Sequence, residues 1–257
     1  MLTLNYHSFG EGKPVVILHG LFGSARNWQS IAKSLSESYQ VITVDLHNHG
    51  HSPHINSMTY PEMAEDIALL IQSLKLDHPA IIGHSMGGKV AMTLALMHAN
   101  QLRGQVIVDI APVSYRHKFS GIISAMKAVT SIELANRTMA EERLAKQIKD
   151  PMLVAFLMQN LIRSEHGFKW RINLQQIENQ LADIGSFPDM LKGKQSRVPS
   201  LFLGGANSAY IAARHNQTIF DYFPAAEIKM IEGAGHWLHV EKPKAFLAEI
   251  NNFLRYL

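Results

Sequence analysis

The chain contains no cysteine in its 257 residues. This absence excludes disulfide bonds, a cysteine nucleophile, and zinc or iron–sulfur sites built from thiolates. A strong excess of charge of one sign is also missing, because 24 Lys and Arg stand against 21 Asp and Glu, a net charge of +3. No run of basic residues is dense enough to form a nucleic-acid surface, so we expect no nucleic-acid partner.

Long hydrophobic runs are missing as well. No apolar stretch approaches the roughly 18 residues that a membrane-spanning helix needs, and residues 1–8 lack the basic and apolar regions of a signal peptide. We therefore expect a cytoplasmic protein without a membrane span. Hydrophobic residues make up 47% of the chain and charged residues 18%, which is typical of a folded protein with a large core. Nothing in the sequence indicates the oligomeric state.

Short apolar runs alternate with helical patterns over most of the chain, which is typical of strand–helix–strand units in a parallel sheet. Each run is nearly continuously apolar, as expected for strands covered by helices on both faces. Residues 2–9 leave room for one edge strand at most. The predicted strands are Val15–Leu18, Val41–Asp45, Ala80–Gly83, Val106–Asp109, Ser200–Leu203 and Ile228–Ile231.

Several predicted helices have recognisable start signals. Thr59–Glu62 and Thr138–Glu141 each fit a capping box. Asp150-Pro151 fits an N-cap residue followed by proline at the first helical position. Met86–Met97 predicts an apolar helix that follows directly from a Gly-rich turn.

The alternation of strands and helices stops after Pro112 and resumes at Pro199. An all-helical insertion between two parallel strands predicts a lid over the strand ends, where ligands bind in open α/β sheets. We therefore expect a core formed by residues 1–112 and 191–257 and a helical lid formed by residues 113–190. Within this lid the predicted helices, with no strand between them, are Phe119–Val129, Pro151–Ile162 and Leu174–Ile184.

The segment Gly83-His-Ser-Met-Gly87 fits the pattern G-x-S-x-G. A predicted strand precedes it and a predicted helix follows, which is the context that a nucleophile elbow requires. In such a turn the serine hydroxyl projects above the sheet, beside a helix N-terminus that stabilises negative charge. We therefore predict that Ser85 is the nucleophile. The alternative is an ordinary serine in a Gly-rich turn, because the five-residue pattern alone often occurs by chance.

The predicted strand Val15–Leu18 runs directly into a His-Gly turn. In enzymes that have a nucleophile elbow, the loop after this strand supplies one backbone N–H of the oxyanion hole. The residue after the nucleophile supplies the other. We assign these two donors to Leu21 and Met86. Each would contribute about 3 kcal/mol of transition-state stabilisation. His19 is expected to shape the turn by hydrogen bonding, without a chemical role.

His236 lies in the Gly-rich loop that follows the last predicted strand, so it reaches the same sheet edge as Ser85. The chain order, with serine first and histidine near the C-terminus, is that of enzymes with this elbow. We predict that His236 is the general base. His239 is the alternative, although we expect it in or beside the next turn. Glu232 is too near His236 in sequence to orient its ring.

The acid that orients the base is less obvious. In most enzymes with this elbow it follows the strand after the lid, and there the chain has Asn207. A neutral amide cannot stabilise an imidazolium as a carboxylate does. Asp109 ends the strand after the nucleophile helix and is predicted as the acid, with a cap or turn role as the alternative. The lid acids Asp183 and Asp189 are more remote alternatives.

Six segments spread over nearly the whole chain make up a further pattern: His19–Ser24, Asp45–Pro53, Gly83–Gly88, Val108–Pro112, Lys169–Asn173 and Gly233–Trp237. In these segments the chain resembles the YbfF-type bacterial esterases of the α/β-hydrolase superfamily. The resemblance implies an α/β fold with a mostly parallel central sheet, helices on both faces and a helical lid. It also implies an ester or thioester hydrolase without a cofactor, with Asp109 as the acid. One departure is His47, where the pattern has arginine.

Four residues are candidates for contact with a small-molecule acyl ester or thioester: Phe22, Trp170, Arg171 and Trp237. For Trp170 and Arg171, a packed aromatic ring and a solvent-facing cation fit equally well.

Four histidines cluster in sequence after the second predicted strand and resemble a metal site: His47, His49, His51 and His54. Because the segment lies where the resembling family has a structural loop, and only Asp45 could complete a ligand set, we expect no metal.

The sequence thus predicts a serine esterase that works through an acyl-enzyme intermediate. A Ser-triad lyase or carbon–carbon bond hydrolase on the same fold is the first alternative. A ligand-binding homologue without catalytic activity is the second. Acyl-chain and leaving-group preferences are not readable from the sequence, because the lid shapes the pocket.

Overall fold

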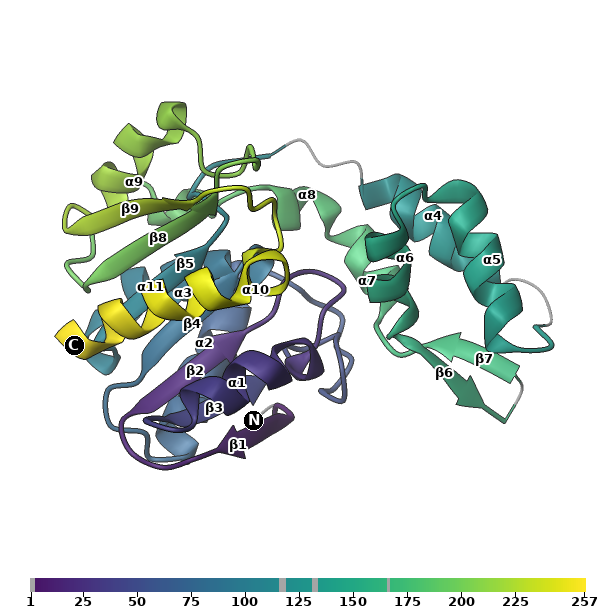
Figure 1. Cartoon of the computed structure of the whole chain (residues 1–257), viewed down its shortest axis with the longest axis horizontal. Helices are drawn as coiled ribbons and strands as arrows, with labels where there is room; N and C mark the ends of the chain where they lie inside the picture. The colour runs from purple at the N-terminus through teal and green to yellow at the C-terminus, as the bar shows by residue number, and fades with distance from the viewer. Residues whose placement is uncertain (1–2, 116–118, 131–133, 166) are drawn as a thin grey trace.

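The structure is a computed structural model that describes residues 3–115, 119–130, 134–165 and 167–257. A seven-stranded sheet with the order β1-β3-β2-β4-β5-β8-β9 forms its centre (Figure 1). Only β1 runs antiparallel to its neighbour, and the other pairs in this sheet are parallel. The strands are β1 Tyr6–Phe9, β2 Pro14–Leu18, β3 Gln40–Val44, β4 Ala80–His84, β5 Gly104–Val108, β8 Ser200–Gly205 and β9 Ala226–Ile231.

The expected fold class and the six predicted strands are therefore confirmed, with the edge strand in the place left for it. β9 differs in one respect, since it is not continuously apolar. Glu227 and Lys229 are exposed on it, because β9 is the far edge strand. The five strands β2, β3, β4, β5 and β8 are buried along almost their whole length.

Helices cover both faces of the sheet (Figure 1). Alternate side chains of the strands supply the two cores, because successive residues point to opposite faces. Val15 and Ile17 pack with α1 and α11 on one face, whereas Val16 and Leu18 pack with α2 and α3 on the other. The helices of this region are α1 Gln29–Leu35, α2 Tyr60–Ser73, α3 Met86–Met97, α9 Asn216–Tyr222, α10 Leu238–Glu241 and α11 Pro243–Tyr256.

Short 3-10 turns complete the core: η1 Ala25–Trp28, η2 Ala99–Gln101, η3 Asp189–Leu191 and η4 Ala213–His215. The start signals predicted for α2 and α3 are confirmed. The Thr59 side chain accepts a hydrogen bond from the N–H of Glu62, and the Glu62 carboxylate accepts one from the N–H of Thr59.

The segment between β5 and β8 forms a separate group of helices that lies to one side of the sheet (Figure 1). Its elements are α4 Phe119–Thr130, α5 Arg137–Gln147, α6 Pro151–Met158, β6 Leu161–Ser164, β7 Gly167–Trp170, α7 Leu174–Asn179 and α8 Leu181–Gly185. We call residues 113–190 the insertion.

The prediction of an insertion without strands was wrong. β6 and β7 form an antiparallel hairpin, and Ser164 pairs with Gly167 at its closed end. Gly167 has a φ of 110°, a backbone conformation that side chains other than glycine rarely adopt. The helix expected over 151–162 consequently ends at Met158. The apolar residues that follow belong to a strand, and a short apolar run does not by itself distinguish the two.

Two further details of the insertion differ from expectation. The helix expected over 174–184 is interrupted at Gln180, where φ is −108° and ψ is 14°, so α7 and α8 are separate. α5 begins at Arg137 and is capped by Asn136, whose side chain accepts from the N–H of Met139, so the capping box predicted from Thr138 was wrong. Asp150 caps α6 as predicted.

Hydrogen bonds tie the insertion to the core. The Asn173 side chain donates to the Asn48 side chain at 3.0 Å, and the Asn160 side chain donates to the Phe22 carbonyl at 2.7 Å. Lys89, on α3, is almost fully buried, and its ammonium donates to the carbonyl of Gly185 at 2.9 Å. These contacts fix the insertion against the carboxyl edge of the sheet.

Within the described ranges, no helix is both long enough and apolar enough to cross a membrane.

A substitution at Gly83 would test the close packing of β4 against α3. A Cβ at this position would lie 2.2 Å from the carbonyl oxygen of Gly87 on α3, and neither backbone can move without shifting the helix. We expect Gly83→Ala to lower the free energy of unfolding by at least about 2 kcal/mol, measured by urea denaturation. Gly121→Ala is the matched control, because Gly121 is exposed on α4 with nothing near the added carbon. That change should raise stability by about 1 kcal/mol. Equal destabilisation by both changes would contradict the packing argument.

Candidate active site

Ser85 stands in the sharp turn between β4 and α3. Its φ of 52° and ψ of −114° are strained for a residue with a side chain. The turn is possible because β4 and α3 approach closely at their glycines. A Cβ on Gly87 would lie 2.5 Å from the carbonyl oxygen of Leu18. The elbow predicted from the sequence is therefore present in geometry.

Leu21 and Met86 both lie beside Ser85, and the three residues line one small pocket. The backbone of Gly20 comes so close that a Cβ there would stand 3.3 Å from the Cβ of Ser85. The N–H of Phe22, the next residue after Leu21, already donates to His49 Nε2 at 3.2 Å. In the part of the chain that the structure describes, no group accepts a hydrogen bond from the N–H of Leu21 or Met86. Both N–H groups are thus available to a ligand.

Asp109 follows β5 with a φ of 50° and is fully buried. Its carboxylate accepts three hydrogen bonds. The N–H of Gly205 donates to Oδ1 at 3.1 Å, the hydroxyl of Ser208 donates to Oδ2 at 2.5 Å, and His236 Nδ1 lies 2.7 Å from Oδ2. A buried charge is tolerated only when it is paired and hydrogen-bonded, and this carboxylate meets that condition.

The contact with Asp109 sets the tautomer of His236. With a carboxylate at Nδ1, that nitrogen carries the proton, so Nε2 is free to accept one. His236 and Ser85 line the same cavity. Ser85 forms no side-chain hydrogen bond in the described part of the chain, and in unliganded sites of this kind the contact between base and nucleophile often tightens only with substrate bound.

Three more residues hold the loop of His236 in place. The buried ring of His84 donates from Nε2 to the carbonyl of His236 at 2.9 Å. The carboxylate of Glu241 accepts from the N–H groups of both neighbours, Gly235 at 2.7 Å and Trp237 at 3.0 Å. The ring of Tyr210 stacks on that of His236 at 4.3 Å.

The alternative histidine, His239, has a different environment. It is buried in α10 and stacks on the indole of Trp28 at 4.1 Å. Burial, together with the neighbouring His236, lowers the pKa of His239 to about 3. In the described residues no hydrogen-bond partner reaches its buried Nδ1, and no carboxylate pairs with it. His239 thus lacks the acid that a general base of this kind uses.

The alternative acids lie elsewhere. Asn207, Asp183, Asp189 and Glu232 are all exposed. The Asn207 N–H donates to the carbonyl of Ala234 at 2.9 Å, which makes this residue part of the turn after β8. Of the carboxylates in the described ranges, Asp109 alone contacts the His236 ring.

His19 has the structural environment expected for it. Its Nδ1 donates to the carbonyl of Gly20 at 2.8 Å, and its Nε2 accepts from the N–H of Leu46 at 3.0 Å. Burial lowers its pKa, so the ring stays neutral.

The histidines after β3 have separate partners. His47 Nδ1 hydrogen-bonds to the Asp66 carboxylate at 2.7 Å. His51 Nε2 accepts a hydrogen bond from the Arg171 guanidinium at 2.8 Å. His49 Nε2 accepts one from the backbone N–H of Phe22. Their nitrogens therefore do not converge on a common point, and no group of three or more metal-ligating side chains lies together in the described residues. The buried His47–Asp66 pair occupies the position where the resembling family has arginine.

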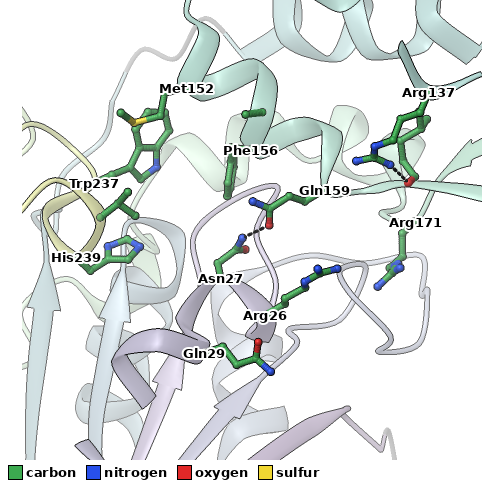
Figure 2. A pocket seen from close by; sticks show the side chains of 13 residues that line it. Arg26, Asn27, Gln29, Arg137, Met152, Phe156, Gln159, Arg171, Trp237 and His239 are labelled. Atoms are coloured by element: carbon green, nitrogen blue, oxygen red, sulfur yellow. Dashed lines mark hydrogen bonds between the residues drawn. The ribbon is translucent and has the colours of Figure 1, made fainter. Parts of the chain in front are cut away.

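Two adjoining cavities open beside Ser85. The smaller, about 80 Å³, is bordered by Ser85, His236 and apolar side chains from α4 and α6. The larger, about 670 Å³, lies between η1, the α10 region and the insertion (Figure 2). They share four bordering residues: Asn27, Phe156, Trp237 and His239. The larger cavity therefore adjoins the cavity at the serine along these four residues.

The four candidates for substrate contact divide accordingly. Phe22 and Trp237 line the cavity at Ser85, and Arg171 lines the larger one. Trp170 does not belong to either wall, because its ring is buried in the insertion and its Nε1 donates to the Met126 carbonyl at 2.7 Å.

Sequence reasoning missed His84, Ser208, Tyr210 and Glu241. His84 occupies a variable position of the G-x-S-x-G pattern, and the other three contact the site only through tertiary structure. Their proximity to Asn207 and His236 in the sequence was the one available signal.

Four buried histidines predict an acid-labile fold. Burial lowers the pKa of His19, His49, His84 and His239 below 6.5. At pH values between the pKa of these histidines in the folded protein and their pKa of about 6.5 in the unfolded chain, the unfolded chain binds more protons than the folded one. The free energy of unfolding is therefore highest above pH 6.5 and falls as the pH drops below that value. From pH 7.5 to 5.5 we expect the free energy of unfolding to fall, with His239 alone contributing about 1 kcal/mol of the loss, measured by urea denaturation at both values.

Two variants control for this effect. His239→Gln should reduce the loss between the two pH values, whereas His78→Asn, at an exposed position, should leave it unchanged. A stability that does not change from pH 7.5 to 5.5 would contradict the burial argument.

Comparison with known proteins agrees with this geometry. A family profile described as the alpha/beta hydrolase fold matches residues 13–243. The chain is 41% identical to the sn-1-specific diacylglycerol lipase ABHD11 of Xenopus tropicalis over 97% of its own length and 80% of that protein. It is 34% identical to esterase YbfF of Escherichia coli, covering 95% of this chain and 94% of that one.

A solved structure of a marine microorganism esterase superposes with a TM-score of 0.93 at 39% identity, covering 98% of this chain and all of that one. Because relatives along nearly the whole chain are named esterases and lipases, the expected enzyme class, a carboxylic ester hydrolase, is confirmed. The family match, these relatives and the seven-stranded sheet with its elbow lead to one conclusion: the chain belongs to the α/β-hydrolase family.

Proposed function

We propose that the protein hydrolyses carboxylic esters or acyl thioesters through an acyl-enzyme formed on Ser85. The observation that carries this proposal is the buried Asp109 carboxylate 2.7 Å from Nδ1 of His236, whose ring lines the same cavity as the strained Ser85. The contact leaves His236 Nε2 unprotonated, which is the state that a general base requires. No cofactor is needed for such a reaction.

In the first step His236 Nε2 takes the proton of the Ser85 hydroxyl as its oxygen attacks the substrate carbonyl. The N–H groups of Leu21 and Met86 donate to the oxyanion, and Asp109 stabilises the imidazolium that forms. The bond to the alcohol or thiol then breaks, and the leaving group takes the proton from His236. Water repeats the sequence, which releases the acid and restores the serine.

The insertion acts as a lid in this proposal. It borders both cavities, through Phe119, Ile122, Leu153 and Phe156 at the serine, and excludes water from one side of the reacting carbonyl. The apolar character of these side chains suits an acyl chain, and Phe22 and Trp237 complete the wall.

A lyase or carbon–carbon bond hydrolase on the same fold would use the same three residues. Release of acid and alcohol in equal amounts from a simple ester distinguishes ester hydrolysis from both. A ligand-binding homologue would show no turnover, although the triad is intact. A panel of p-nitrophenyl esters and acyl thioesters of increasing chain length then ranks the acyl preference.

Ser85→Ala should lower kcat on p-nitrophenyl butyrate by about 10⁶-fold, because the nucleophile is lost. In the unmodified protein a p-nitrophenyl alkylphosphonate should add covalently to Ser85, as located by peptide mass spectrometry. Ser34→Ala, at an exposed position on α1, is the matched control and should keep both turnover and labelling. Labelling of another residue, or turnover in Ser85→Ala, would refute the assignment.

Asp109→Asn should lower kcat by about 10⁴-fold, since an amide neither selects the tautomer of His236 nor stabilises its charged form. Steady-state kinetics at pH 7.5 would measure this loss. Asp183→Asn, in the insertion, is the control and should retain full activity. The reverse result, with activity lost in Asp183→Asn and kept in Asp109→Asn, would contradict the assignment of Asp109 and favour Asp183 in the insertion as the acid.

A further inference from the structure

Three arginines surround the larger cavity: Arg26 on η1, and Arg137 and Arg171 on the insertion (Figure 2). No aspartate or glutamate is among the described residues that border this cavity. His239, which also borders it, stays neutral because its pKa is lowered to about 3. The larger cavity is therefore a concentration of positive charge without a counter-charge in its wall.

Two of these guanidinium groups have donors to spare. The guanidinium of Arg26 forms no hydrogen bond or ion pair in the described ranges. Arg171 gives one donor to His51, while its buried Nε has no partner. Arg137 differs, because both of its terminal guanidinium nitrogens donate to backbone carbonyls, those of Met158 and Leu161. Figure 2 shows the Arg26 side chain extended toward Arg171 along one rim of the cavity.

The nearest acid does not neutralise this pair. Asp45 borders an adjacent hollow that Arg26 and Arg171 also line. Its carboxylate is buried and already accepts from the N–H of Ala25 at 2.7 Å, from the N–H of His51 at 2.8 Å and from Asn5 at 2.7 Å. It contacts neither arginine, and it holds the loop on which Arg26 is placed.

The position of the pair relative to Ser85 indicates what it would bind. If the acyl chain lies along the apolar wall around the serine, the alcohol or thiol half of the substrate points toward the larger cavity, which shares Phe156 and Trp237 with the cavity at Ser85. Guanidinium groups bind phosphate oxygens through paired, charge-assisted hydrogen bonds, and two of them match the charge of a phosphate dianion.

We propose that Arg26 and Arg171 form a subsite for a phosphate group on the leaving half of the substrate. The inference rests on the proposed function, because it uses Ser85 to orient the ester. The subsite narrows the proposed substrate class to acyl esters or thioesters whose alcohol or thiol carries a phosphate.

A pair of esters that differ only in this group tests the proposal. We expect kcat/KM for 1-butyrylglycerol 3-phosphate to exceed that for 1-butyrylglycerol at least tenfold at low salt, and the ratio to fall as NaCl is added. Arg26→Gln and Arg171→Gln should each lower the ratio by about tenfold, through KM for the phosphate ester. Arg255→Gln, an exposed arginine on α11, is the control and should leave the ratio unchanged. A ratio near one in the unmodified protein, or one that Arg26→Gln does not lower, overturns the subsite.

Direct binding separates this inference from the proposed function. In the Ser85→Ala protein, calorimetric titration should show tighter binding of 1-butyrylglycerol 3-phosphate than of 1-butyrylglycerol, and adding Arg26→Gln should remove the difference. If neither ester is hydrolysed by the unmodified protein but this difference remains, the proposed function fails and the subsite stands. Equal binding of the two esters rejects the subsite, whether or not the esters are hydrolysed.

Discussion

The buried carboxylate of Asp109 organises the carboxyl edge of this sheet. A carboxylate in the interior is costly unless its oxygens are fully hydrogen-bonded, and here the three donors come from two other segments of the chain. The N–H of Gly205 and the hydroxyl of Ser208 belong to the end of β8 and its loop, and His236 belongs to the loop after β9. Satisfying one charge therefore brings three loops to fixed positions. The His236 ring is oriented as part of the same arrangement.

The strain at Ser85 depends on a second constraint, the close approach of β4, α3 and the end of β2. Side chains at Gly83 or Gly87 would collide with backbone oxygens, so the turn has room only because these positions have no Cβ. The same approach brings Gly20 against Ser85. Strain of this kind persists where the surroundings fix the backbone on every side.

The insertion completes the cavity walls at this edge. It is fixed to the core by hydrogen bonds from Asn160, Asn173 and Lys89, and its α6 and hairpin face η1 across the larger cavity. Core and insertion each contribute one arginine with unused donors to this space. The cavity wall is therefore a joint product of two segments that are far apart in the chain, and its charge depends on how the insertion is seated.

Much of the fold was predictable, because it depends on local patterns. Apolar runs such as Val15–Leu18 define buried strands by composition alone, and Gly83–Gly87 with its flanking strand and helix defines the elbow. The predictions failed inside the insertion, where the apolar residues after Met158 fit a helix or a strand equally well and a glycine at a positive φ decided for the hairpin. The break at Gln180 was missed for the same reason, since local spacing did not reveal it.

The sequence by itself determined the sheet, the order of its elements, and the identity of Ser85, His236 and Asp109 as candidates, because each follows a strand whose end lies at one edge. Tertiary structure alone decided which acid meets His236, which of Leu21 and Phe22 keeps a free N–H, and which residues border the cavities. It also placed Trp170 inside the insertion and Arg171 on the cavity wall, although the two are adjacent in the chain. The reason is physical: hydrogen-bond partners and cavity walls are set by which segments pack together, and packing joins residues that no local pattern links.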